Sequence, residues 1–348
     1  MSKAESYYFN HLNKFQKAVY HSIQTGLREL KDTIIVPKMD MKELSEIFFL
    51  VRLEDPFLFY SERFQCRHYA KADSMELIPE YLFNKKQIKA HTKAMESRIQ
   101  KLVRPAQNMT EWEKEKYIHD FICENVHYDK LKKAYSHEII GPLGHGIGVC
   151  EGIAKTVKAL CDALNLWCII AICDNNPEKK IKYRHTWNIL KLGGKYYHLD
   201  ATFDNSLSKD GVIRYDYFNI DDSSCFRDHE PVIWKIPECV DSKKKYYLEK
   251  KISFTTYEEV RKRCAQAVKK GRVFLFHWRG GYLTRAVLKD LLEIFKEEAE
   301  KKEKHMTLSL NLSQAVLQVR FHNELQEELV LEQANEGEME EEAVNSKE

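Results

Sequence analysis

Residues 144–154 read GHGIGVCEGIA: a glycine-rich segment, a cysteine, and the start of an apolar run. The pattern predicts a loop that leads into a helix, with Cys150 in the first turn. Two interpretations of that thiol are open at this point. Cysteine packs well as a small hydrophobic side chain, but the positive end of a helix is also where a thiol is most easily ionised.

The segment after the cysteine predicts a helix packed beside a buried strand. Apolar residues recur at helical spacing on one face, namely Ile153, Val157, Leu160 and Leu164. Residues 166–173, LWCIIAIC, form a continuous apolar run of strand length, which is typical of a strand buried on both faces.

The clearest hairpin follows, in HTWNILKL (185–192), two glycines, and KYYHLDAT (195–202). Two glycines between alternating runs favour a two-residue type I′ turn, so Leu192 should pair with Lys195. Because side chains alternate between the faces of a strand, this register makes His185 and Asp200 diagonal neighbours on one face. A turn one residue longer or shorter would put them on opposite faces.

A thiol, an imidazole and a carboxylate together suit nucleophilic catalysis. An ordinary cysteine, with a pKa of about 8.5, is only a few per cent ionised at neutral pH. An imidazolium at His185 and the helix start would both favour the thiolate of Cys150, and Asp200 would orient and stabilise that imidazolium. The N–H groups at the helix start could stabilise an oxyanion.

Two alternatives to this arrangement stay open. His198 shares the face of Asp200 and is a rival base. The three residues Cys150, His185 and Asp200 could also bind zinc, although no further ligand is suitably spaced.

Three segments resemble the cysteine, histidine and aspartate boxes of the transglutaminase-like superfamily, bacterial branch: GVCEGIAKTVKALCDALNL, HTWNIL and YYHLDATFD. The upstream KYIHDFICENVHYDK is similar to the helix before the cysteine box of that family. The resemblance covers about residues 110–230. It implies a papain-like α+β core, in which the helix bearing the cysteine packs on an antiparallel sheet. It also implies Cys150 as nucleophile, His185 as acid/base and Asp200 as orienter.

The chain departs from the family pattern in two places. Ile153 stands where an aromatic residue is common, which implies a change of packing. DNSLSKDG (204–211) lacks the alternating carboxylates of a calcium loop, and the chain does not match the animal calcium-dependent enzymes outside the boxes. We therefore expect no metal and no cofactor.

The sequence predicts four parts: a helical and mixed N-terminal region (1–105), the catalytic core (106–245), a small α+β domain (250–323), and an acidic tail (324–348) expected to be disordered. In the first part we expect an amphipathic helix over residues 1–30 and short strands at 46–52, 57–60 and 64–69. In HWRGGYLTR (277–285) the glycines are typical of a turn, although Arg279 and the next helix start could also form an anion pocket.

Composition narrows the class of partner. Among 348 residues, 55 Lys+Arg against 53 Asp+Glu give a net charge of +2, which indicates neither a nucleic-acid nor a membrane partner. No run approaches the roughly 18 apolar residues that span a bilayer, and no signal-peptide core is present, so we expect a cytoplasmic location. The nine cysteines include no Cys-x-x-Cys pair, which favours reduced thiols.

These observations lead to one functional hypothesis and one alternative. The hypothesis is cysteine-dependent acyl transfer on a peptide or side-chain amide through a thioester, with hydrolysis modestly favoured over transfer to an amine. The substrate would be a peptide or protein. The alternative is a binding scaffold that has the transglutaminase-like fold without catalysis.

Overall fold

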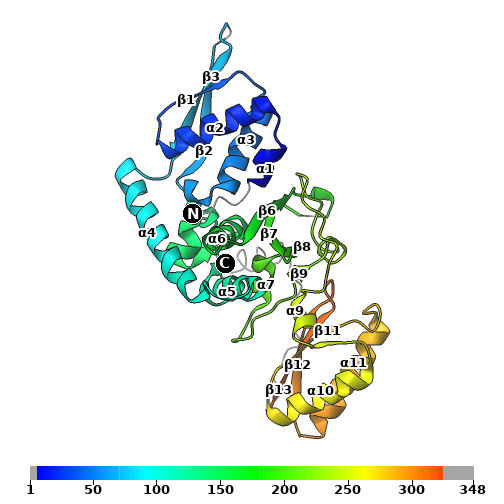
Figure 1. The fold of residues 1–348 in the computed structure, drawn as a ribbon. Helices are drawn as coiled ribbons and strands as arrows, with labels where there is room; N and C mark the ends of the chain where they lie inside the picture. Colours follow the sequence, from blue (N-terminus) through cyan, green and yellow to red (C-terminus); the bar gives the residue numbers. More distant parts are fainter. Residues whose placement is uncertain (1–5, 70, 180, 183, 324–348) are drawn as a thin grey trace, which may run out of the picture.

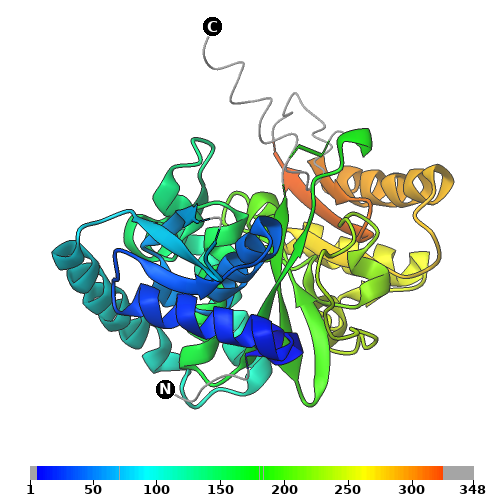
Figure 2. The same cartoon turned by 90° about the horizontal axis from the view of Figure 1, so that it is seen from above.

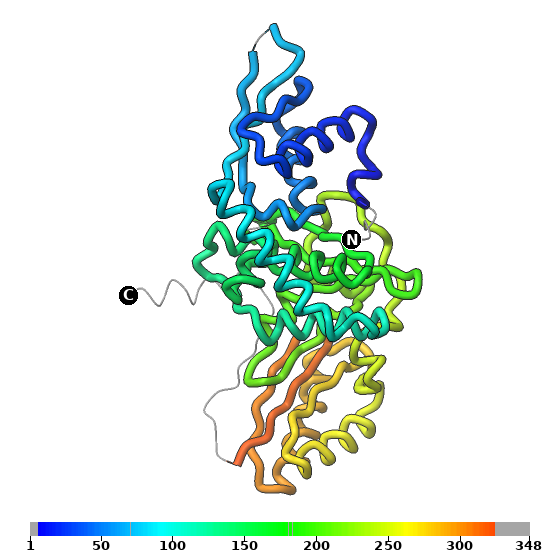
Figure 3. The backbone as a smooth tube through the Cα atoms, turned by 60° about the vertical axis from the view of Figure 1, so that its left-hand side comes forward, coloured from blue at the N-terminus to red at the C-terminus, as the bar shows by residue number. Residues whose placement is uncertain are grey.

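The computed structural model describes residues 6–69, 71–179, 181–182 and 184–323. It has a mixed α+β fold, in which the chain passes through an N-terminal region, a central sheet and a C-terminal sheet in that order (Figure 1). The tube view shows the same order along the molecule, and the view from above places the green central strands between the other two regions (Figures 2 and 3). None of the described helices is long and apolar enough to cross a bilayer. The acidic segment predicted at 324–348 lies outside the described residues.

The central sheet is antiparallel, and helix α6 (Cys150–Ala163) packs against it as predicted. Its strands, in spatial order, are β6 (Trp167–Cys173), β7 (His185–Leu192), β8 (Lys195–Leu199) and β9 (Phe218–Ile220). Strand β6 is buried along nearly its whole length, because α6 contacts it as well as its neighbour β7.

The register of the β7–β8 hairpin agrees with the prediction from the two glycines. Leu192 pairs with Lys195. Gly193 and Gly194 have φ values of 55° and 81°, and a type I′ turn requires positive φ at both central positions. Strand β8 ends at Leu199 because the next residue, Asp200, caps the following helix.

The remaining elements of the central region surround α6. Helix α5 (Glu111–Asn125) packs against α6 and α7, and it begins at a capping box between Thr110 and Glu113. The short elements are α7 (Ala201–Leu207), α8 (Asp222–Cys225), α9 (Tyr246–Glu249), β4 (His127–Tyr128), β5 (Ile147–Gly148) and a π-helical turn (Gly141–His145).

The N-terminal region corrects three expectations. Asn13 forms a capping box with Gln16, so the expected single helix is divided after Leu12. Residues 46–52, expected as a strand, lie inside a helix, because Asp40 caps it and apolar side chains recur at helical spacing. Residues 57–60, also expected as a strand, lie in a 3₁₀ helix (Pro56–Leu58) and the turn after it, because Asp55 caps that helix. The elements are α1 (Tyr7–His11), α2 (Lys14–Arg28), β1 (Ile34–Pro37), α3 (Met41–Glu54), β2 (Ser61–His68), β3 (Ser74–Tyr81) and α4 (Lys85–Val103).

The C-terminal region has its own hydrophobic cluster, and it contacts the central region through polar side chains and through Val316, which belongs to the larger core cluster. Its elements are β10 (Ser253–Phe254), α10 (Tyr257–Lys270), β11 (Phe274–Trp278), α11 (Arg285–Glu300), β12 (His305–Asn311) and β13 (Val316–His322). Asn311 Nδ2 donates to Tyr217 Oη at 3.2 Å, and Gln314 Nε2 donates to Ser224 O at 3.0 Å. These two contacts join the loop after β12 to the part of the central region next to the candidate site.

Candidate active site

Cys150 is the first residue of α6, as predicted, and its side chain lies next to the start of β7. The N-cap residue Val149 offers no side-chain cap, and the thiol donates to the carbonyl oxygen of Arg184 at a Sγ···O distance of 3.9 Å. Arg184 directly precedes His185 in the chain. The thiol therefore sits at the positive end of a helix and beside the strand that carries the imidazole.

Packing explains the glycine after the cysteine. A Cβ on Gly152 would lie 2.1 Å from the carbonyl oxygen of Ser136. A Cβ on Gly148 would lie 2.8 Å from Pro142 Cγ. The glycines at 148 and 152 thus let the first turn of α6 press against the chain between α5 and α6, and they fix the position of the thiol between them.

A cavity of about 520 Å³ reaches Cys150. Although the residue is only 7% exposed, it lines this cavity together with both polar and apolar side chains, including Phe49, Tyr128, Ile172 and Asp174. A larger cavity of about 1170 Å³ lies between the N-terminal helices, α4 and α6, and Cys150 does not line it. Of these two cavities, only the smaller one is lined by the thiol.

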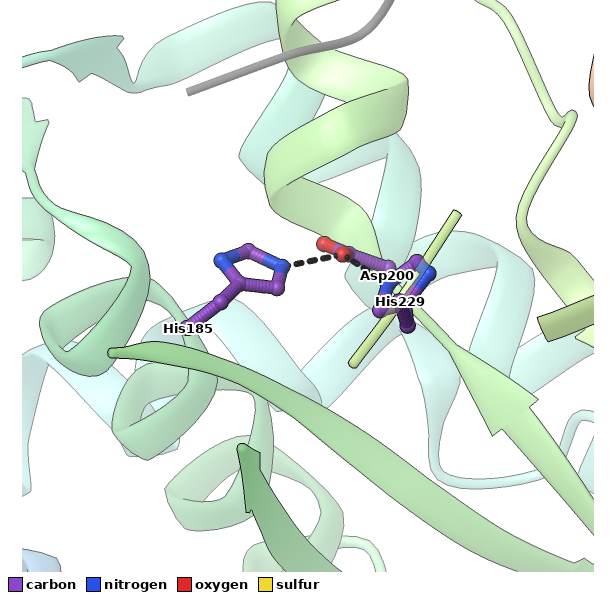
Figure 4. Close-up of side chains that lie close together, drawn as sticks. All are labelled: His185, Asp200 and His229. Atoms are coloured by element: carbon purple, nitrogen blue, oxygen red, sulfur yellow. Dashed lines mark hydrogen bonds and ion pairs between the residues drawn. The ribbon is translucent and has the colours of Figure 1, made fainter. Parts of the chain in front are cut away.

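His185 and Asp200 form the contact that the hairpin register predicts. His185 Nε2 lies 2.6 Å from Asp200 Oδ2. Asp200 is also the N-cap of α7, and its Oδ1 accepts the backbone N–H groups of Thr202 (2.8 Å) and Phe203 (3.0 Å). Since Nε2 is directed at the carboxylate, the other ring nitrogen, Nδ1, points away from Asp200 (Figure 4).

Two aromatic rings hold the imidazole of His185 in this orientation. The ring of Phe203 stacks on it with a centroid distance of 4.5 Å, and the ring of Trp187 lies nearly parallel to it at 5.9 Å. These contacts restrict rotation of the imidazole and limit the access of water to it. Phe203 is positioned for this role because Asp200 caps the helix in which it lies.

His229 is a third member of this cluster that the sequence did not reveal. Its Nε2 lies 2.9 Å from Asp200 Oδ2, the same oxygen that His185 contacts, and the two imidazoles approach the carboxylate from different sides (Figure 4). His229 lies in the chain after α8, and no strand alternation or helical spacing relates such a position to the hairpin. Its only local signal was the adjacent acidic residue Asp228.

Four donors therefore surround Asp200, two backbone N–H groups and two imidazole N–H groups. Burial alone would raise the pKa of this carboxyl group, but the charge and hydrogen bonds of His185 and His229 outweigh burial. The pKa of Asp200 is consequently held well below its usual range. The carboxylate is ionised wherever the protein is folded at neutral pH.

The rival base, His198, is occupied by other groups. The indole Nε1–H of Trp187 donates to His198 Nδ1 at 2.9 Å, and His198 Nε2 lies 2.8 Å from Asp222 Oδ1. Because Nδ1 must keep its lone pair to accept the indole N–H, Nε2 carries the proton and donates it to the carboxylate. His198 has no nitrogen left to take a proton from Cys150, so the reading of His198 as the base is wrong.

The geometry favours hydrogen bonds over metal binding at these positions. Among the described residues, two sets bring three potential ligand atoms within 4.8 Å of one another: His185, Asp200 and His229, and His198, Asp222 and Cys239. Neither set includes Cys150. In the first set the N···O separations of 2.6 and 2.9 Å are hydrogen-bond distances, and in the second the Nε2 of His198 carries a proton. The zinc interpretation is not supported by these contacts.

A buried ion network anchors the first turn of α6. Lys155 Nζ lies 2.7 Å from Glu151 and 2.8 Å from Glu138, and Glu138 also pairs with Arg52. Burial would raise the pKa of Glu151, but the charges of Lys155 and Arg52 and a hydrogen bond from His137 lower it. Since Glu151 directly follows Cys150, this network fixes the position of the Cys150 backbone.

Arg279 was the candidate residue for an anion pocket. It directly follows β11, where the turn that the glycines predict begins. Its Nε donates to Ser253 Oγ at 2.9 Å. It lines a cavity of about 660 Å³ with other basic residues, Lys251, Lys262 and Arg263, while the start of α11 does not contribute to the lining. The glycines that follow it form the predicted turn, and the pocket with the helix start is not formed.

Comparison with known proteins identifies the central region. Residues 96–201 match the sequence profile of the transglutaminase-like superfamily. This segment, which contains Cys150, His185 and Asp200, is therefore similar to that superfamily, which includes cysteine-dependent acyltransferases and proteases. No curated protein matches the chain.

Two solved structures share limited similarity with it. One is the crystal structure of a TGase, with 13% identity and a TM-score of 0.28 over 41% of this chain and 44% of that chain. The other, from Parabacteroides distasonis ATCC 8503, is described as a candidate protease and has 13% identity and a TM-score of 0.26 over 44% of this chain and 38% of that chain. The chain thus spans less than half of either structure, and scores this low carry no information on activity.

Proposed function

We propose that this protein is a cysteine-dependent acyl-transfer enzyme that acts on a peptide or side-chain amide. In this proposal Cys150 is the nucleophile, His185 is the acid/base and Asp200 orients the imidazole. The observation that carries it is the 2.6 Å contact between His185 Nε2 and Asp200 Oδ2. The thiol of Cys150 lies close to this pair in the chain, because its Sγ is 3.9 Å from the carbonyl oxygen of Arg184, the residue before His185.

The reaction proceeds in two stages. The thiolate of Cys150 attacks the amide carbonyl carbon, and the N–H groups at the start of α6 stabilise the oxyanion that forms. His185 donates its Nδ1 proton to the leaving nitrogen, the C–N bond breaks, and a thioester remains on Cys150. A second nucleophile then attacks the thioester, gives its proton to His185 and releases the thiol.

The second nucleophile decides between hydrolysis and amine transfer. Water gives hydrolysis and a primary amine gives transglutamination, and the same three residues serve both. We favour hydrolysis, because residues 204–211 lack the carboxylate pattern of the calcium-dependent transferases. Peptides or proteins are the proposed substrates, and the cytoplasm is the proposed location.

The test begins with the reactivity of the nine cysteines. The intact protein is treated with a trace of iodoacetamide from pH 5 to pH 9, and the modified cysteines are located by mass spectrometry. Cys66 is the internal control, because it is more exposed than Cys150 and burial raises the pKa of its thiol. We expect Cys150 to react at least tenfold faster than Cys66 at pH 6, and to lose this advantage in His185→Ala.

The second part separates the reaction outcomes. A glutamine-containing peptide is incubated with the enzyme, with and without a primary amine, and both released ammonia and amine-linked product are measured. Ammonia without amine-linked product supports hydrolysis, whereas amine-linked product supports transfer. If Cys150 reacts no faster than Cys66 and neither product forms, the scaffold alternative is correct and the proposal is wrong.

A further inference from the structure

Both ring nitrogens of His229 face hydrogen-bond acceptors. Nε2 lies 2.9 Å from Asp200 Oδ2, and Nδ1 lies 3.0 Å from Asp228 Oδ1 and 3.1 Å from the carbonyl oxygen of Cys225. A neutral imidazole has one N–H and one lone pair, so it would point a lone pair at one of these oxygens. Only the imidazolium, with two N–H groups, satisfies both sides.

The surroundings of His229 hold that charge in a buried site. The residue is 6% exposed. The titratable groups that face it are the carboxylates of Asp200 and Asp228, the thiol of Cys225 and the imidazole of His185, at a ring-centroid distance of 5.4 Å. Burial lowers the pKa of His229, but the neighbouring thiol and the two carboxylates outweigh burial and raise it well above its usual range.

The rest of the contact shell is aromatic and extends to the C-terminal region. The rings of Trp187, Phe203 and Tyr217 lie 4.8, 4.8 and 5.6 Å from the His229 ring centroid. Tyr217 Oη donates to Asp228 Oδ2 at 2.7 Å, and Asn311 Nδ2 donates to Tyr217 Oη. The carboxylate of Asp228 therefore accepts a hydrogen bond from Tyr217 as well, and this second bond keeps it in contact with His229.

We propose that His229 is a positioning residue of the active site. It is a permanent imidazolium that holds the carboxylate of Asp200 in place and lowers the pH above which His185 loses its proton. This inference rests on the proposed function. Both imidazoles share one oxygen, Oδ2, so the charge of His229 already neutralises much of the carboxylate that would stabilise a proton on His185. His185 then releases its proton at a lower pH than it would beside an unshared carboxylate.

The consequence for catalysis follows from the two tasks of His185. It must donate a proton to the leaving nitrogen and then accept one from the second nucleophile. A general acid/base works best when its pKa lies near the working pH. Beside an unshared buried carboxylate, His185 would stay protonated and could not accept a proton from the second nucleophile. The charge of His229 weakens this effect of the carboxylate, so His185 can serve in both steps.

The test uses iodoacetate, an anionic alkylating reagent, on the full chain. The imidazolium of His185 attracts this reagent to the thiolate of Cys150, so the alkylation rate falls at high pH when His185 loses its proton. In His229→Gln the side-chain amide keeps a donor for Asp200 but removes the charge. We expect this alkaline limb to move up by about two pH units in His229→Gln, as a unit charge some 5 Å away at an effective dielectric constant of about 20 would produce.

His198→Gln is the matched control. It changes an imidazole that lies on the same sheet and contacts the same tryptophan but pairs with Asp222 instead of Asp200, so the alkaline limb should move far less than in His229→Gln. An unmoved limb in His229→Gln, or an equal shift in both variants, overturns the inference. Failure of the proposed function is a different result: the alkaline limb would then persist in His185→Ala.

A second measurement detects the charge of the imidazole directly. In ¹⁵N-histidine-labelled wild-type protein, an imidazolium has two protonated ring nitrogens with characteristic shifts. At least one histidine should keep both through pH 8.5, and in His229→Gln that signal should be lost. If every histidine is neutral at pH 8.5, His229 does not carry the charge and the inference is wrong.

Discussion

Two imidazole–carboxylate pairs lie on either side of Trp187, and only one of them suits catalysis. His185 pairs with Asp200, and His198 pairs with Asp222. The two pairs contain the same residue types, and both histidines belong to the β7–β8 hairpin. The two pairs differ in their contact with Trp187: its indole N–H donates to the second ring nitrogen of His198, whereas its ring stacks beside the imidazole of His185.

The two carboxylates differ as well. Asp200 is buried and receives four hydrogen bonds, whereas the side chain of Asp222 is 33% exposed and its Oδ2 accepts the backbone N–H of Cys239. An aspartate beside a histidine is therefore a weak functional signal by itself. What distinguishes a catalytic imidazole is one nitrogen held by a carboxylate and the other left for the reacting group.

The strongest test of this comparison exchanges each carboxylate for an amide. Asp200→Asn should lower kcat/KM for amide hydrolysis by roughly 10²- to 10⁴-fold, because the amide no longer holds the proton on Nε2 of His185. Asp222→Asn should change kcat/KM less than threefold. The measurement is initial-rate kinetics on one peptide amide. Equal losses in the two variants would mean that the two pairs are functionally equivalent.

Acid stability separates the same two carboxylates with a smaller effect. The pKa of Asp200 is lowered on folding, so its contribution to stability is complete above the unfolded pKa of about 3.9 and is lost as the pH falls toward the folded pKa. In wild type this group alone should make the free energy of unfolding fall by up to about 1.4 kcal/mol per pH unit below pH 4.

Urea unfolding between pH 6 and pH 2.5 measures that slope. Asp200→Asn should have a shallower slope than wild type by about this amount, and Asp222→Asn should follow wild type. If Asp200→Asn keeps the wild-type slope, the charge and hydrogen bonds of the two imidazoles do not act on Asp200 as the contacts indicate.

The smallest expected effect is that of Tyr217→Phe, which tests whether Tyr217 belongs to the candidate active site. Tyr217→Phe removes the hydroxyl that donates to Asp228, which should destabilise the fold by about 1 kcal/mol and lower kcat/KM less than threefold. Tyr197→Phe is the control, since its hydroxyl donates to Asp241, at 3.2 Å. Thermal unfolding and kinetics on both variants are the measurements. A loss of more than tenfold in Tyr217→Phe alone would extend the functional cluster to the contact with the C-terminal region.

Local rules account for what could be predicted. The type I′ turn at Gly193–Gly194 fixes the register, and strand alternation then places His185 against Asp200. The glycine-rich segment and the apolar spacing likewise locate α6 with Cys150 at its start. The same rules failed at residues 46–52, where apolar and charged residues fit a strand over a few positions, while the cap at Asp40 that specifies a helix lies outside that window.

The amino-acid sequence alone determined that Cys150 begins a helix and that His185 faces Asp200, because each position is set by spacing within one helix or one hairpin. Only the tertiary structure decided that His229 shares Asp200 and that the indole of Trp187 occupies His198. Both facts concern which donor is paired with which acceptor. In a buried site these hydrogen-bond partners depend on every element packed around the atoms. The loop that carries His229 has no periodic pattern from which its position could be predicted.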